Sequence, residues 1–117
     1  MADDIKDLSK YIKSASEKTV EKLKRALIAG GNAIVTKARQ NITTQKAIDT
    51  GTLRNSVVSN QNFGGGNLEV VVGPTVDYGV YVEYGTSKMR DRPYLIPAFN
   101  VVAPRVEEAM QKIAREN

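Results

Sequence analysis

The feature that most constrains the fold is a long amphipathic pattern over residues 3–42. Its apolar or small residues recur at steps of three and four, at Ile5, Leu8, Ile12, Ala15, Thr19, Leu23, Ala26, Leu27, Gly30, Ile34, Ala38 and Ile42. These positions share one face of a helix and leave lysines and glutamates on the opposite face. At ~1.5 Å per residue the helix would be about 60 Å long, which exceeds the width of a domain of this size. We therefore expect a break or kink at Gly30-Gly31, unless the N-terminal half projects. The alternative for the two glycines is a close-packing or hinge point.

A small antiparallel sheet is predicted after this helix. Residues 43–51 form a polar connector, Leu53 to Phe63 alternates weakly, and Leu68 to Val72 is rich in β-branched residues. The Gly-rich run Asn62–Asn67 predicts a flexible turn between the last two segments, which therefore form a hairpin. Val76 to Tyr84 is compatible with a short helix or a third strand.

A second helix is predicted from Pro97 to about Arg115, because proline suits the first turn of a helix. Pro104 should kink this helix or mark its true start. The fold class is thus α+β, with both helices packed on a small antiparallel sheet. We expect one domain over residues 1–117. It comprises the long helix (1–42), the sheet with its hairpin and a basic loop (43–96), and the C-terminal helix (97–117).

The chain contains neither cysteine nor histidine, which limits the kinds of disulfide, metal and catalytic site that it can form. Without cysteine there is no disulfide framework or thiolate metal site, and without histidine the commonest general base is missing. We therefore expect no cofactor and no metal. No apolar run approaches the roughly 20 residues that span a bilayer, and the acidic N-terminus lacks a signal-peptide layout. These features predict work in a reducing cytoplasm, with no membrane partner.

Asp49-Thr50-Gly51 matches the catalytic tripeptide of aspartic proteases, so a homodimeric protease using Asp49 is a remote alternative. Such enzymes place the tripeptide after an apolar strand in a mostly β dimer. Here Gln45-Lys46-Ala47 precedes it, after a long helical segment. We therefore interpret Asp49 or Thr50 as a hydrogen-bond acceptor in a turn and expect a positive φ at Gly51. No other catalytic arrangement is apparent, and we predict that the chain is not an enzyme.

A basic loop between two rigid ends is the best candidate site. We expect its residues to form a protein interface: Thr86, Ser87, Lys88, Met89, Arg90, Asp91, Arg92 and Tyr94. Pro93 favours an extended Arg92, and Leu95 and Ile96 should attach the end of the loop to the sheet. Arg, Tyr and Met are enriched at interfaces. Basic residues beside aromatics also suit single-stranded nucleic acid, so a small nucleic-acid-binding protein is the main alternative.

Four short motifs of the sequence resemble those of the small neck and tail-completion proteins of long-tailed bacteriophages. They are Asp49 to Ser56, Val70 to Gly73, Tyr78 to Thr86 and Arg92 to Ala98, in the expected order over about two-thirds of the chain. The group includes the lambda protein Z relatives and others described as minor tail components. Tyr94 stands where the family usually has Phe, so its hydroxyl needs a partner or water if it is buried.

The resemblance implies a non-enzymatic virion protein that completes the tail, or joins head to tail, by forming a ring in the neck. Its partners would be copies of itself, in a ring that forms either before or only upon assembly of the particle, and neighbouring connector, stopper or tail-terminator proteins. Residues 63–86 carry three acidic and no basic residues between positive flanks, which suits head-to-tail contacts between copies. DNA would only pass through the lumen, without sequence-specific contacts. The chain would act in the virion tail or neck and assemble in the host cytoplasm.

Overall fold

The computed structural model describes residues 17–45 and 50–116. The first part of the predicted long helix and Asp49 therefore lie outside the described residues. The elements, in chain order, are α2 (Glu17–Gln45), α3 (Thr50–Ser56), β1 (Val57–Asn62), the short 3-10 turn η1 (Gly64–Gly66), β2 (Glu69–Pro74), α4 (Tyr78–Tyr84) and α5 (Leu95–Arg115).

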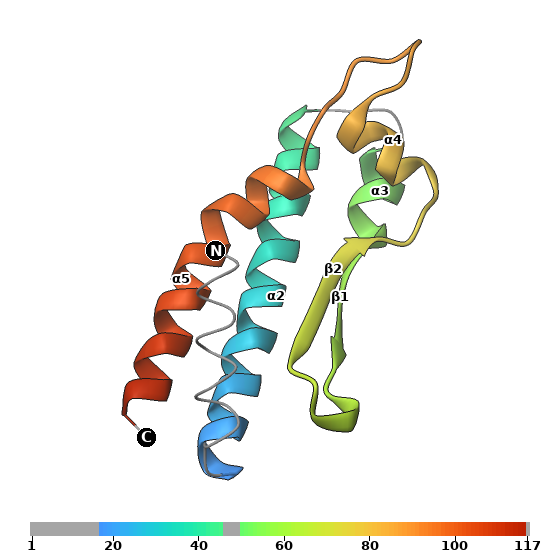
Figure 1. Cartoon of the computed structure of the whole chain (residues 1–117). Helices are drawn as coiled ribbons and strands as arrows, with labels where there is room; N and C mark the ends of the chain where they lie inside the picture. Colours follow the sequence, from blue (N-terminus) through green and yellow to red (C-terminus); the bar gives the residue numbers. More distant parts are fainter. Residues whose placement is uncertain (1–16, 46–49, 117) are drawn as a thin grey trace.

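Helix α2 forms the middle layer of the fold, with α5 along one side and the β1–β2 hairpin along the other (Figure 1). This confirms the predicted α+β class, with two long helices and a small antiparallel sheet. The C-terminal helix reaches the sheet through α2 rather than directly, because α5 packs mainly against α2. With 29 residues, α2 is about 44 Å long.

Gly30 and Gly31 allow both neighbouring layers to approach α2 closely. A Cβ at Gly30 would collide with Val106 of α5, and a Cβ at Gly31 would collide with Ser59 and lie 2.6 Å from Cγ1 of Val70, both in the hairpin. The predicted break is wrong, since α2 is helical from end to end. The close-packing alternative is correct. The cost of two glycines in a helix is offset by the packing that they permit on both sides.

Helix α3 replaces the first part of the predicted strand. Leu53, which was expected to begin the strand, is completely buried on α3, and β1 begins only at Val57. Arg39 of α2 donates from Nε to the carbonyl of Arg54 at 3.1 Å and from Nη2 to the carbonyl of Val57 at 2.9 Å. These bonds satisfy carbonyls where α3 ends and β1 begins. Gly51 lies within α3 without the expected positive φ.

The predicted hairpin is confirmed, with antiparallel partners from Val57↔Pro74 to Asn62↔Glu69. Its turn passes through Gly65 and Gly66, at φ 64° and 82°, a conformation that favours glycine. Lys24 of α2 lies over the ring of Phe63 at 5.5 Å from its centroid, which attaches this end of the hairpin to α2. Between β2 and the basic loop, the helical alternative for residues 76–84 is the correct one.

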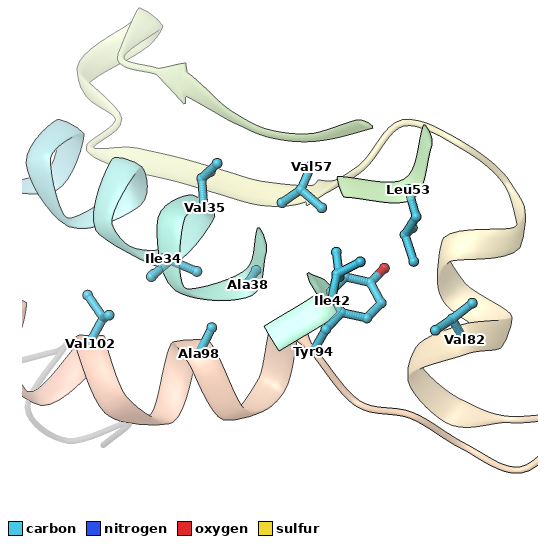
Figure 2. Packing of buried hydrophobic residues seen from close by; sticks show 10 residues of the cluster. All are labelled: Ile34, Val35, Ala38, Ile42, Leu53, Val57, Val82, Tyr94, Ala98 and Val102. Atoms are coloured by element: carbon cyan, nitrogen blue, oxygen red, sulfur yellow. The ribbon is translucent and has the colours of Figure 1, made fainter. Parts of the chain in front are cut away.

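The hydrophobic core lies where α2, α3, α4, β1 and the start of α5 meet (Figure 2). Its buried members are Ile34, Val35, Ala38, Ile42, Leu53, Val57, Val82, Tyr94, Ala98 and Val102. Helix α5 begins at Leu95, two residues before the predicted start, so Pro97 lies in its first turn. Pro104 lies inside the continuous helix and does not mark its start. Figure 1 shows the first turns of α5 at an angle to the rest.

Candidate protein-interaction site

The predicted contact loop connects α4 to α5 and extends beyond both helices at one end of the subunit (Figure 1). Six of its predicted contact residues are exposed, namely Thr86, Ser87, Lys88, Arg90, Asp91 and Arg92. Met89 is half-buried and packs against the core. Tyr94 is completely buried, so it supports the loop from within the subunit instead of belonging to its surface.

The loop contains a tight hydrogen-bonded turn. The amide of Thr86 donates to the carbonyl of Met89 at 2.8 Å, and the amide of Met89 donates back at 3.3 Å. The amide of Lys88 also donates to Oγ1 of Thr86 at 3.2 Å. Gly85 starts the turn at φ 76°, and a Cβ there would lie 2.7 Å from the amide nitrogen of Asp91. The two arms of the loop thus approach each other only because residue 85 is glycine.

Glu83 holds the base of the loop to the start of α5. Its Oε1 accepts the amides of Tyr94 and Leu95 at 3.0 and 2.8 Å, and its Oε2 accepts the amide of Ile96 at 3.1 Å. The first amides of a helix have no partner within the helix, and a negative charge is favourable beside them. Glu83 therefore caps α5 from α4, and its side chain is only 5% exposed.

Tyr94 forms the second attachment between α4 and α5. Its hydroxyl donates to the carbonyl of Gly79 at 2.8 Å, which confirms that a buried tyrosine here needs a partner. A Cβ at Gly79 would lie 3.0 Å from this hydroxyl and 2.6 Å from Cβ of Pro74. Burial, together with the nearby charge of Glu83, raises the pKa of Tyr94 to about 12. Figure 2 shows the ring among the buried residues of the core.

Helix α2 holds the same segment from the other side. Nδ2 of Asn41 donates to the carbonyl of Tyr94 at 3.0 Å, and Nε2 of Gln45 donates to the carbonyl of Pro93 at 2.7 Å. The amide of Arg92 donates to the carbonyl of Val82 at 2.7 Å. The loop is therefore fixed where it leaves α4 and where it enters α5, and its exposed residues lie between these anchors.

The cations of the loop are free to bind a partner. Among the described residues, none of Lys88, Arg90 and Arg92 forms an ion pair or a side-chain hydrogen bond. Two exposed aromatic residues of α4 precede them, Tyr81 (55% exposed) and Tyr84 (68% exposed). Unpaired cations next to exposed tyrosines are typical of a protein-binding surface, where Arg and Tyr carry much of the binding energy.

Sequence reasoning missed the residues that anchor the loop. Glu83 was not among the predicted site residues, but its side chain is buried and caps α5. The attachment expected from Ile96 is wrong, since Ile96 is 43% exposed, and Tyr94 is the buried anchor. Leu95 is half-buried against the core. A glutamate shortly before a Gly-Thr turn carries no local signal for capping a helix 12 residues later.

Metal-binding clusters and membrane-spanning helices are both absent from the described residues, 17–45 and 50–116. They contain no group of three or more His, Cys, Asp or Glu that could hold a metal ion. None of the helices in this part of the chain is long and apolar enough to cross a membrane.

Residues 6–85 match the family described as "Bacteriophage HK97-gp10, putative tail-component". The chain belongs to the HK97-gp10-like family. This match includes α2, the hairpin and α4, and ends at Gly85, so the basic loop and α5 lie outside it. Neither a curated protein nor a solved structure matches the chain.

Membership of the HK97-gp10-like family identifies the chain as a phage tail component and places it in the virion tail. The predicted resemblance to phage tail proteins is confirmed at this level; the lambda protein Z group is not distinguished within it. A tail component is a structural protein, so the prediction that the chain is not an enzyme is confirmed by its family. Its partners are accordingly other virion proteins.

Proposed function

We propose that this tail component forms a ring in the phage neck, where it completes the tail or joins it to the head. The observation that carries the proposal is the basic loop, which exposes unpaired cations from a base anchored to α2, α4 and α5. A contact surface that is ordered before binding loses less conformational entropy on assembly. This favours the loop as a preformed docking element.

Copies of the chain and the adjoining connector, stopper or tail-terminator proteins are the proposed partners. Residues 63–86 carry only acidic charges, which can attract the positive surfaces of another copy, and two of these residues, Glu69 and Asp77, are exposed. Glu83, the third acidic residue of that segment, is buried and contributes to the fold instead. Rings form when a heterologous interface closes on itself, and surfaces of opposite charge on one subunit support such an interface. DNA would pass through the lumen without sequence-specific contacts.

The proposal is tested by a loop variant in which Lys88, Arg90 and Arg92 are all replaced by serine. A phage lacking its own copy of the gene is complemented with this variant, and the amount of the chain in purified particles is measured. We expect a folded subunit with unchanged thermal stability, because exposed substitutions usually cost little. Incorporation should be lost, and heads and tails should accumulate unjoined.

A control variant removes the same charge from another exposed surface. Lys18, Lys22 and Arg25 lie exposed on α2, away from the loop, and are replaced by serine. The control should assemble normally if the loop itself is the contact. Normal infectivity of the loop variant would contradict the proposed role of the loop. Equal loss in both variants would show that total charge matters and the loop does not.

A further inference from the structure

The β1–β2 hairpin is the whole sheet in the described part of the chain, so each strand has one edge without a partner strand (Figure 1). Proteins usually protect such edges with charged residues, proline or bulges. Strand β1, Val57–Asn62, contains no charged residue and no proline, and its pairing with β2 is continuous without a bulge. The outer edge of β1 is therefore open to an additional strand along most of its length.

The hairpin's own hydrogen bonds show which groups of β1 face this edge. Next to the Val57↔Pro74 pair, the amide of Thr75 donates to the carbonyl of Ser56 at 2.9 Å. Bonded and non-bonded pairs alternate in an antiparallel ladder. Val57 is therefore in a non-bonded pair and directs its amide and carbonyl outward, as do Ser59 and Gln61 further along β1. Arg39 confirms this orientation, because its guanidinium reaches the outward carbonyl of Val57 at 2.9 Å.

The outer edge of β2 has the complementary arrangement. By the same alternation, Val70 and Val72 direct their amides and carbonyls away from β1, and Pro74 ends the series without an amide hydrogen. Pro74 occupies the position opposite Val57, whose outward carbonyl already has Arg39 as its donor. In a contact that places Pro74 of one copy opposite Val57 of the next, the amide that the β2 edge lacks would face the one β1 carbonyl that already has a donor.

We infer that the outer edge of β1 pairs with the outer edge of β2 from a second copy of this chain, which joins the hairpins into a continuous sheet. Ser59 would lie opposite Val72 of the neighbouring copy, and Gln61 opposite Val70. Each of these pairs exchanges two hydrogen bonds, which use the outward amides and carbonyls of Ser59 and Gln61 on one edge and of Val70 and Val72 on the other. The contact is heterologous, since two different edges of the same subunit meet.

The pairing is compatible with a ring of identical subunits. The inference rests on the proposed function, because that function supplies the ring. Copies related by rotation about a ring axis present β2 in the same direction. Because β1 runs opposite to β2 within each hairpin, β1 meets the neighbour's β2 in the antiparallel sense. The edge contact is short, so it needs the additional contacts of the assembled particle to persist. Free subunits should consequently associate only weakly.

Disulfide trapping tests the pairing directly, because the natural chain contains no cysteine. One preparation carries Asn60→Cys and another carries Val71→Cys, both at exposed positions. In the inferred sheet these two residues form a non-bonded pair between copies, with Cα atoms about 4.5 Å apart, which suits a disulfide. Each molecule has a single cysteine, so a bond within one chain is impossible. The two preparations are mixed, concentrated and oxidised, and are also co-incorporated into particles.

Val101→Cys on α5 provides a matched control, since Val101 and Val71 are similarly exposed, at 46% and 54%. We expect the Asn60–Val71 cross-link to exceed the Asn60–Val101 cross-link at least tenfold. Adding Gln61→Pro to the Asn60→Cys chain should lower the yield several-fold, while Gln61→Ala should not. This proline removes an outward amide that the hairpin's own ladder does not use.

The outcomes separate this inference from the proposed function. Particles that contain the chain but show no Asn60–Val71 cross-link overturn the edge pairing and leave the neck role standing. A dominant cross-link between two Asn60→Cys chains also overturns it, because β1 would then pair with β1 in a two-fold dimer. If the purified chains cross-link as expected but are absent from particles, the pairing holds and the proposed function fails. If the purified chains do not cross-link and the chain is also absent from particles, both the edge pairing and the proposed function are wrong.

Discussion

Removing the carboxylate of Glu83 should strongly destabilise the subunit. The carboxylate accepts three amides at 2.8–3.1 Å at the start of α5 and is almost completely buried. Loss of a cap costs about 1–2 kcal/mol, and a charge at a partly buried helix terminus contributes up to ~2 kcal/mol more. We therefore expect Glu83→Ala to lower the free energy of unfolding by about 3 kcal/mol. The melting temperature should fall by roughly 10 °C.

Urea unfolding followed by circular dichroism measures this change. Glu83→Gln keeps the shape of the side chain and one acceptor oxygen, so its cost should be intermediate between wild type and Glu83→Ala. Glu108→Gln on the exposed surface of α5 provides the control and should change stability by less than about 0.5 kcal/mol. If Glu83→Gln costs no more than Glu108→Gln, the carboxylate does not cap α5 in solution, and the account of how the loop is anchored is wrong.

Three further predictions concern packing and pH. Gly30→Ala should lower the free energy of unfolding by about 1–3 kcal/mol, because the added methyl group collides with Val106. In a double-mutant cycle, Val106→Ala should restore part of this stability. If the two substitutions lower the free energy of unfolding additively, the close contact is absent. Tyr94→Phe should cost about 1 kcal/mol at pH 7 through the lost hydrogen bond. Burial raises the pKa of Tyr94 in the folded protein to about 12, so wild type should lose about 2 kcal/mol more stability than Tyr94→Phe between pH 10 and pH 12. A difference in stability that does not change with pH would refute this. Both Leu95→Ala and Met89→Ala should lower the melting temperature, since both side chains pack against the core; an unchanged value for Met89→Ala would place it outside the packed loop.

Periodicity predicted the elements that are long or strongly patterned. The amphipathic run predicted α2, the β-branched run beside a glycine turn predicted the hairpin, and the proline-led segment predicted α5. Each of these signals is local, because it depends on which face of one element is apolar. The family resemblance, confirmed as a phage tail component, came from short motifs in a fixed order.

Sequence alone could not predict features that depend on what packs against an element. The glycine pair in α2 looks like a helix break unless the two layers that it admits are known. Leu53 belongs to a helix because the core at the end of α2 accepts it, although its neighbours suggested a strand. Glu83 and Tyr94 anchor the loop through contacts 11 to 15 residues apart in the chain. Tertiary contacts of this kind override local propensity.

Electron microscopy of virions assembled with and without this chain tests the central claim most directly. A ring-forming neck component predicts a ring of density at the junction of tail and head that disappears when the chain is absent, together with tails that no longer attach to heads. Virions that join normally and keep unchanged density at this junction would contradict the proposed function.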